Sequence, residues 1–161
     1  MNRIKVSIII TVFNRKEDLK KSIPSLLQGD FPKDEYEILI GDGGSTDSTS
    51  EYISDLIEKS KKFPQKFPKI RYFPTLKNLG EMGNSIKPLY ASKGKYICYF
   101  NSDAIVSKNW LKNIYNLMES KNLDVSGALQ LTDPEKDHVL VLIWDLLENL
   151  LYHIEKENHY S

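Results

Sequence analysis

The sequence has little of several features that define other classes of protein. It contains one cysteine, Cys98, in 161 residues, which excludes a disulfide framework and a zinc site built from cysteines. Lys plus Arg number 22 and Asp plus Glu number 22, so there is no net charge to indicate a nucleic-acid partner. No apolar run approaches the roughly 18 residues that span a bilayer. These absences favour an ordinary globular chain.

The N-terminal stretch lacks the layout of a secretory signal. Residues 1–10 alternate polar and apolar side chains instead of placing a charged segment before an apolar one. We therefore expect a cytoplasmic protein, and a position at the inner face of a membrane stays open. In such a protein we expect Cys98 to be a small buried apolar side chain.

Short apolar segments rich in β-branched residues alternate with segments of helical spacing. Two of the apolar segments, 4–13 and 96–100, are nearly continuous in apolar character, which predicts strands covered on both faces. The alternation predicts an α/β sandwich with a mostly parallel sheet and right-handed crossovers. The expected strands are residues 4–13, 36–40, 69–73, 96–100 and 123–131.

Helices are expected between these strands. Ser48 and Glu51 have the spacing of a capping box that would open the second helix. The third helix is expected over 81–92, with its large apolar side chains buried against the sheet. Those side chains are Met82, Ile86, Leu89 and Tyr90.

The C-terminal segment differs from the rest of the chain. Over 139–154, apolar residues occur nearly all round a predicted helix, which indicates burial by more than a small domain of its own. We expect a contact there with a second copy of the chain, forming a homodimer, or with a missing C-terminal domain. The sequence is accordingly divided into an α/β domain, 1–131, and a C-terminal helical segment, 132–161, that is expected to form an interface.

Three clusters of polar residues follow three of the predicted strands. They occupy residues 11–15, 42–47 and 101–103. In a parallel sheet the carboxyl ends of the strands share one edge, and ligands bind outside that edge. The three clusters are therefore expected to meet at one site.

The residue types in these clusters suit a nucleotide diphosphate compound. Asp103, at the tip of a strand, can hold a hard divalent cation whose other ligands are waters and phosphates. Such a cation stabilises the charge that builds on a diphosphate leaving group. Asp42 can accept hydrogen bonds from a base or sugar, and Gly43 permits a close backbone approach. Thr11 and Phe13 offer a hydrogen bond and an aromatic face to a nucleobase.

Each of these residues alone also fits an ordinary structural role. Asp103 could cap a nearby helix, and Gly43 could serve a tight turn. Phe13 could belong to the core, while Thr11 and Asn14 could close the first turn. Their order along the chain and their shared edge are what favour a ligand site.

Four blocks resemble the successive motifs of the family 2 glycosyltransferases. In the family's order, over residues 4–130, they read VSIIITVFNR, EILIGDGGSTDST, NLGEMGNSIKPLYASKGKYICYFNSDA and NWL. The resemblance implies a GT-A fold, a Rossmann-like three-layer sandwich, here truncated after its donor-binding half. It also implies transfer of a sugar from a nucleotide diphosphate donor to an unknown acceptor, with inversion and with Mg²⁺ or Mn²⁺.

The resemblance assigns donor-binding positions residue by residue. Thr11, Phe13 and Asn14 match the block that borders the base, and Phe13 stands where the family usually has a stacking tyrosine. Asp42 matches the first acid of the usual Asp-Asp-Gly-Ser pattern, whereas Gly43 replaces the second acid. This replacement leaves the identity of the base open.

The remaining assignments fall on two further blocks. Asn101 replaces the first acid of the usual Asp-X-Asp metal motif, Ser102 is its central residue, and Asp103 keeps the acid that meets the cation. The asparagine–glycine block that lines the donor pocket is matched by Asn78, Gly80 and Asn84.

The catalytic base is not identified by any motif. Asp145 and Glu148 lie in the right general stretch, but within a helical pattern. The alternative to an enzyme is therefore a non-catalytic module that binds a nucleotide sugar or a partner protein. An unrelated nucleotide-binding α/β domain is disfavoured, because neither GxxxxGK[ST] nor GxGxxG follows the first strand.

Overall fold

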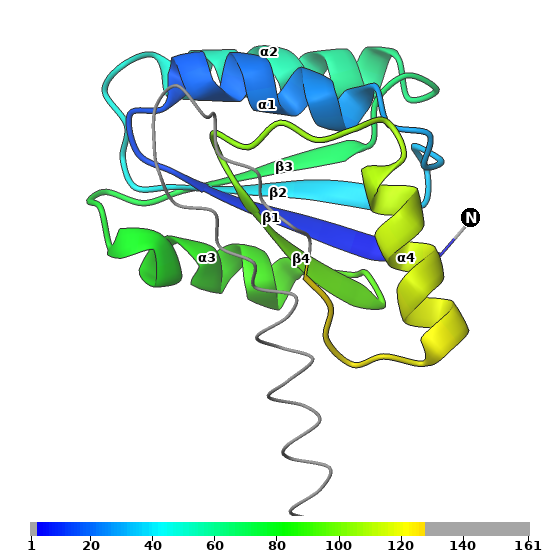
Figure 1. Ribbon diagram of the computed structural model, residues 1–161. Helices are drawn as coiled ribbons and strands as arrows, with labels where there is room; N and C mark the ends of the chain where they lie inside the picture. The colour runs from blue at the N-terminus through cyan, green and yellow to red at the C-terminus, as the bar shows by residue number, and fades with distance from the viewer. Residues whose placement is uncertain (1–2, 128–161) are drawn as a thin grey trace, which may run out of the picture. The chain divides into compact units, whose positions relative to one another are not determined.

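The computed structural model describes residues 3–127 and shows a three-layer α/β arrangement. Its four strands are all parallel, in the order β3-β2-β1-β4. Helices α1 and α2 lie on one face of the sheet and α3 on the other (Figure 1). The elements are β1 (Val6–Val12), α1 (Lys16–Leu27), β2 (Tyr36–Asp42), α2 (Thr49–Lys62), β3 (Lys69–Pro74), α3 (Gly80–Ala91), β4 (Tyr96–Asn101) and α4 (Trp110–Lys121).

The predicted fold class and the first four predicted strands are confirmed. The fifth, expected over 123–131, is not formed by residues 123–127, and its remaining residues lie outside the described part. The expected boundary at residue 131 and the apolar segment 139–154 also lie outside it. The contacts between residues divide the chain into two compact units, Met1–Tyr115 and Asn116–Ser161. Between residues 3 and 127, no helix has both the length and the apolar character to cross a bilayer.

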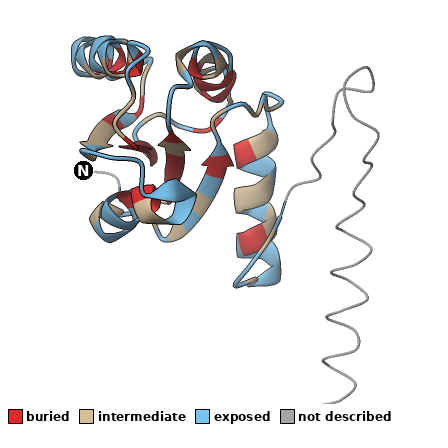
Figure 2. Cartoon of the chain, turned by 90° about the vertical axis from the view of Figure 1, so that its left-hand side faces the viewer, coloured by how far each residue is buried: buried red, intermediate tan, exposed pale blue. Residues whose placement is uncertain are grey.

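The centre of the sheet forms the core of the first unit. Buried residues lie along the strands (Figure 2). β1 consists largely of β-branched residues, and Ile8 and Ile10 of β1, like Ile38 and Ile40 of β2, are fully buried. Such residues suit a strand with covers on both faces. Burying one of these side chains contributes about 1.5–3 kcal/mol to the stability of the folded state.

Helix α3 faces the sheet with a different side from the one expected. The four side chains expected to be buried are all exposed, so that prediction is wrong: Met82 by 75%, Ile86 by 52%, Leu89 by 37% and Tyr90 by 88%. The helix buries Asn84, Ser85 and Pro88 instead. These side chains allow α3 to approach β2 closely, since a Cβ on Gly41 would lie only 2.1 Å from the Asn84 carbonyl oxygen.

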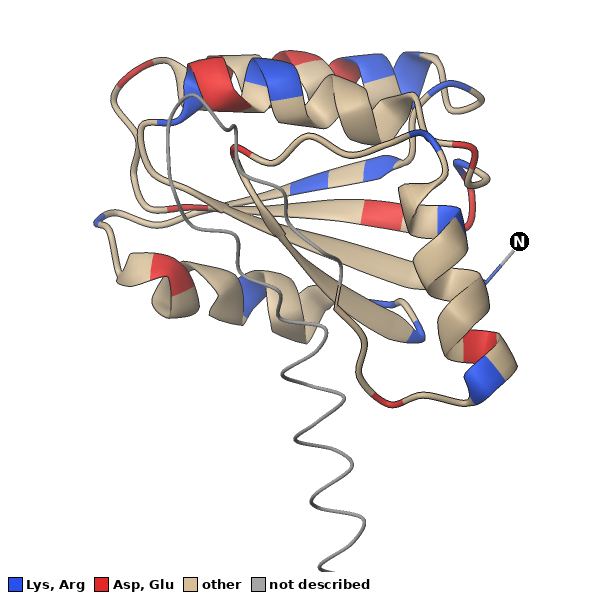
Figure 3. Ribbon diagram, viewed as in Figure 1, with Lys and Arg blue, Asp and Glu red and all other residues tan. Residues whose placement is uncertain are grey.

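β4 is an edge strand in the part of the chain described here, and only one of its faces is covered. Phe100 is buried and packs edge-on against Trp110, with ring centroids 5.6 Å apart. On the other face Ile97 and Tyr99 are 41% and 52% exposed, so the prediction of a strand buried on both faces is wrong for β4. Charged residues are concentrated on α1 and α2 and sparse on α3 (Figure 3). Cys98 is partly buried against the core, and desolvation raises the pKa of its thiol to about 12.

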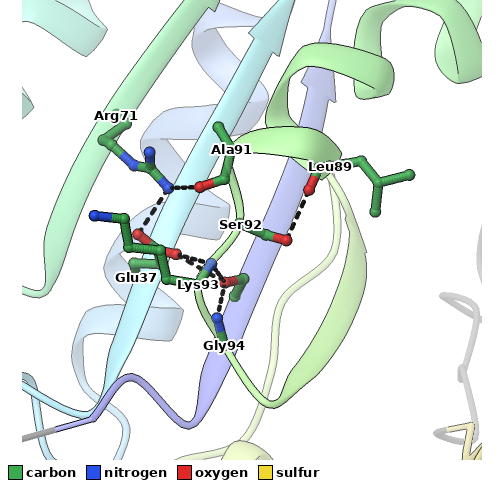
Figure 4. Close-up of polar contacts among 8 residues, drawn as sticks. Glu37, Arg71, Leu89, Ala91, Ser92, Lys93 and Gly94 are labelled. Atoms are coloured by element: carbon green, nitrogen blue, oxygen red, sulfur yellow. Dashed lines mark hydrogen bonds and ion pairs between the residues drawn. The ribbon is translucent and has the colours of Figure 1, made fainter.

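A buried carboxylate joins the strands near their amino ends. Glu37 has no exposed surface, and its Oε1 accepts hydrogen bonds from the Ser7 hydroxyl and the Lys93 backbone N–H, both at 2.8 Å. Its Oε2 accepts one from Arg71 Nη2 at 3.0 Å, and the same nitrogen donates to the Ala91 carbonyl (Figure 4). One side chain therefore ties β1, β2, β3 and the α3–β4 connection together.

We predict that Glu37→Gln lowers the free energy of unfolding by about 2–3 kcal/mol, because the change removes the charge that Arg71 faces in a buried setting. Urea denaturation followed by circular dichroism measures this. Glu58→Gln is the matched control, since Glu58 pairs with Lys61 on the surface, with side chains 72% and 67% exposed. Such a pair contributes about 0–1 kcal/mol. Equal effects of the two changes would contradict the role given to Glu37.

Candidate functional site

A cleft of about 450 Å³ opens at the carboxyl ends of β1 and β4. Strand order runs from β1 through β2 to β3 on one side and continues with β4 on the other, so the chain reverses its direction of winding between β1 and β4. Ligands of open parallel sheets bind at such a switch point. The cleft is lined by Thr11, Val12, Phe13, Arg15, Asn78, Gly80, Glu81, Asn84, Asn101, Ser102 and Asp103.

The strand register brings the three polar clusters to one edge, as predicted. Thr11 of β1 pairs with Gly41 of β2 on one side and with Asn101 of β4 on the other. Beyond these residues the strands end, and their connecting loops begin at the same level. Clusters that lie 30 to 90 residues apart in sequence therefore become neighbours.

Asn14 shapes the loop that follows β1, and it does not line the cleft. Its φ is 54°, in the left-handed region that asparagine tolerates better than most residues. Its backbone N–H donates to Ser45 Oγ at 2.8 Å, and its Oδ1 accepts from the Thr46 N–H at 2.7 Å. These bonds join the β1–α1 loop to the β2–α2 loop.

Asp42 is buried at the end of β2 and is also absent from the cleft lining. Its Oδ1 accepts from the backbone N–H and the hydroxyl of Ser45, at 2.9 and 2.7 Å, and its Oδ2 accepts from the Tyr72 hydroxyl. Desolvation and this last hydrogen bond raise the pKa of Tyr72, so the phenol stays protonated. The predicted contact of Asp42 with a base or sugar stays a prediction.

Asp47, and not Ser48, caps the start of α2. Ser48 has a left-handed φ of 64° and makes no side-chain cap hydrogen bond, so the predicted capping box is wrong. Asp47 Oδ1 accepts from the Thr49 N–H at 3.1 Å, and its Oδ2 accepts from the Lys16 N–H at 3.1 Å. Desolvation acts to raise the pKa of Asp47, but the hydrogen bonds from Thr49 and Lys16 outweigh it and lower that pKa.

An amide pair borders the cleft at the start of α3. Asn78 Oδ1 accepts from Asn84 Nδ2 at 3.0 Å and from the Gly80 N–H at 2.9 Å. Asn84 Oδ1 in turn accepts from the Leu79 N–H at 3.2 Å. A Cβ on Gly43 would lie 2.8 Å from Asn84 Nδ2 and 2.9 Å from Asn78 Oδ1. Glycine at 43 is therefore a packing requirement of this pair.

The tip of β4 presents oxygen ligands to the cleft. The Ala104 N–H donates to the Asn101 carbonyl at 3.1 Å, which closes a turn over Ser102 and Asp103. Asp103 is exposed, and its carboxylate has no hydrogen bond or ion pair with residues 3–127. Within that range there is no group of three His, Cys, Asp or Glu that could hold a metal ion. The tip thus fits Mg²⁺ or Mn²⁺, provided that water and phosphate supply most of the ligands.

Three residues that line the cleft were given no individual binding role from the sequence: Val12, Arg15 and Glu81. Val12 and Arg15 belong to the predicted cluster 11–15, and Glu81 directly follows Gly80, so their place among the predicted positions was the available signal. The predicted residues that do line the cleft are Thr11, Phe13, Asn78, Gly80, Asn84, Asn101, Ser102 and Asp103. Their roles in binding stay predictions.

Comparisons with known proteins identify relatives of this chain. The family described as glycosyl transferase family 2 matches residues 7–159. The chain is 28% identical over 158 residues to a Methanococcus voltae protein, dolichyl N-acetyl-alpha-D-glucosaminyl phosphate 3-beta-D-2,3-diacetamido-2,3-dideoxy-beta-D-glucuronosyltransferase, covering 94% of this chain and 43% of that protein. It is 30% identical over 125 residues to the poly(ribitol-phosphate) beta-N-acetylglucosaminyltransferase TarP of Staphylococcus aureus, covering 75% and 35%. The chain thus spans less than half the length of these relatives.

Solved structures share the fold. Residues 1–349 of S. aureus TarS match with a TM-score of 0.64 and 22% identity, covering 79% of this chain and 39% of that one. The same fragment in complex with UDP-GlcNAc gives a TM-score of 0.62 at 21% identity, covering 79% and 37%. A mannosyltransferase from Pyrobaculum calidifontis, in complex with GDP-Man and Mn²⁺, gives 0.63 at 18% identity, covering 73% and 33%.

We predict that Gly43→Ala lowers the free energy of unfolding by about 1–3 kcal/mol, because the added methyl group displaces the Asn78–Asn84 pair. Gly127→Ala is the matched control, since a Cβ there meets no atom of residues 3–127 within 4 Å. Thermal denaturation of both variants beside the wild type measures the difference. If Gly43→Ala were as stable as Gly127→Ala, the packing requirement would be refuted.

Proposed function

Because the chain belongs to glycosyl transferase family 2, we propose that its cleft binds the nucleotide diphosphate part of a sugar donor and that the protein transfers the sugar to an acceptor. The observation that carries this proposal is the position of Asp103. Its carboxylate is exposed, has no hydrogen bond or ion pair with residues 3–127, and stands just beyond the end of β4, in a cleft at the switch point of the sheet. The cleft volume lies within the range of small-molecule sites, about 300–1,000 Å³.

The nucleoside is proposed to lie near the end of β1. Phe13 is 42% exposed although it is a large aromatic residue, and it lines the cleft together with Thr11. An aromatic face of this kind can stack on a base, and a threonine hydroxyl can donate or accept a hydrogen bond. Asp42 and Asn14 are proposed to support the nucleoside site indirectly, because their hydrogen bonds hold the loops that carry Thr11 and Phe13.

A divalent cation, Mg²⁺ or Mn²⁺, is proposed to bind at Asp103, with the Asn101 and Ser102 oxygens nearby. When bound, it would neutralise charge on the diphosphate as the bond to the sugar breaks. The pairing of GDP-Man with Mn²⁺ in the P. calidifontis enzyme supports this assignment. The hard oxygen donors at the β4 tip support it independently.

Inversion at the anomeric carbon is proposed for the whole reaction, and it needs a base to take the proton of the acceptor hydroxyl. The carboxylates that line the cleft are Glu81 and Asp103. Asp145 and Glu148 lie outside the described residues. The proposal therefore assigns donor binding to residues 3–127 and leaves the base unassigned.

A second candidate is a non-catalytic module that binds the nucleotide sugar. It is favoured by one observation, namely that Asn101 stands in place of the first acid of the usual Asp-X-Asp metal motif. Both candidates require the same donor site. They differ in whether the bond between sugar and phosphate is broken.

We predict that UDP-, GDP- or dTDP-sugars raise the melting temperature only in the presence of Mn²⁺, and that Asp103→Asn abolishes the rise. The reason is that the amide has lost the charge that holds the cation. Differential scanning fluorimetry measures this. Asp55→Asn serves as control, because Asp55 pairs with Lys59 on the surface of α2 and does not line the cleft. A rise in melting temperature that persists in Asp103→Asn would contradict the assignment of the cation to Asp103.

We also predict slow, Mn²⁺-dependent hydrolysis of the sugar donor by the wild type, because water can replace the acceptor in a family 2 transferase. Release of nucleoside diphosphate, quantified by anion-exchange chromatography, is expected to fall to background in Asp103→Asn. If the wild type binds the donor but releases nothing above background, the non-catalytic module is the correct reading.

A further inference from the structure

We propose that Arg15 binds the phosphate oxygens of the donor, and that its contact with Asp18 is only its resting position. The inference rests on the proposed donor site and adds to it a residue that the family resemblance did not assign. It starts from the position of Arg15 in the cleft lining, which Arg15 shares with Phe13 and with residues 101–103 of the β4 tip.

The backbone on both sides of Arg15 is held by the β2–α2 loop. On one side the Asn14 N–H and Oδ1 bind Ser45 and Thr46. On the other side the Lys16 N–H donates to Asp47. The base of the Arg15 side chain is therefore fixed at the cleft, so little backbone entropy is lost when the side chain meets a ligand.

The guanidinium group has N–H donors that its contact with Asp18 does not use. Its Nη1 donates to Asp18 Oδ2 at 3.0 Å, and the two side chains are 55% and 31% exposed. An exposed pair of this kind contributes little stability, so a ligand can replace it readily. A guanidinium carries five N–H donors in a fork that matches phosphate, and the pair with Asp18 uses few of them.

The charges in the cleft explain why a positively charged side chain is needed there in addition to the metal ion. Among residues 3–127, Arg15 is the one basic side chain that lines the cleft, and the carboxylates there are Glu81 and Asp103. A diphosphate linkage adds a negative charge on each phosphoryl group. One divalent cation therefore leaves the loaded cleft with excess negative charge, and Arg15 reduces that excess. Arg71 cannot do so, because Glu37 holds it near the amino ends of the strands.

The ligand chemistry assigned to Arg15 is thus the phosphoanion, and neither the base nor the sugar. The competing explanation is structural: Arg15 and Asp18, three residues apart, would only stabilise the first turn of α1. The two explanations differ in what Asp18→Asn does. A structural pair is lost from either side, whereas a phosphate ligand needs only the arginine.

Isothermal titration calorimetry of the full chain with Mn²⁺ tests the proposal. The probes are UDP, GDP and dTDP, each compared with its nucleoside. Arg15→Ala is expected to weaken binding of the preferred diphosphate about 10- to 100-fold and to change nucleoside binding less than about 3-fold. Arg15→Lys is expected to recover part of the loss, because it restores the charge without the fork.

Two control variants complete the experiment. Asp18→Asn is expected to leave diphosphate affinity unchanged or to raise it. Lys20→Ala removes another basic residue of α1, one that pairs with Glu17, and is expected to have no effect. Circular dichroism confirms that each variant is folded.

Three results would overturn the proposal. The first is wild-type diphosphate affinity in Arg15→Ala, and the second is an equal loss of nucleoside and diphosphate binding. The third is a loss in Asp18→Asn as large as that in Arg15→Ala, which would establish the structural pair. If the wild type bound none of the three diphosphates, the donor site itself would be rejected, and the inference with it.

Discussion

The parallel pairing of β1 with a strand on each side is the constraint on which the cleft depends. Because Thr11 lies opposite both Gly41 and Asn101, the strands β1, β2 and β4 end at one level, and the loops that follow them begin there. The reversal of winding beside β1 then leaves space between two of those loops. A shift of β4 by one residue would turn its tip to the other side of the sheet. The location of Asp103 therefore follows from backbone pairing and needs no contact of its own.

Much of this arrangement could be predicted from the sequence, because the responsible signals are local. Runs such as 6–12 and 96–100 are rich in β-branched or aromatic residues, and such residues favour strands. Polar residues that interrupt those runs, Asn101 to Asp103 among them, mark the strand ends. Chain order and parallel pairing then suffice to bring the clusters together.

The rest could not be predicted, because it depends on contacts between residues distant in sequence. The spacing of Met82, Ile86 and Tyr90 favours a buried apolar stripe, yet the close approach of α3 to Gly41 selects the opposite, small-residue side. Side-chain partners are equally hard to predict: the Asp42 carboxylate accepts hydrogen bonds from Ser45 and from Tyr72, thirty residues away. Around the cleft, polar residues thus divide into those that face it and those that hold its loops, and residue type alone does not separate them.

The tie at Glu37 also bears on how the α3–β4 connection can change over time. The Lys93 and Gly94 amides of this surface segment donate into the interior, to Glu37 and to Ser7. Adding or deleting a residue here would leave a buried carboxylate without one of its donors, at a cost that surface loops seldom carry. We therefore expect homologues to vary the side chain at position 93 freely while conserving the number of residues between α3 and β4. This connection is a surface segment by location, but it is constrained like a part of the core.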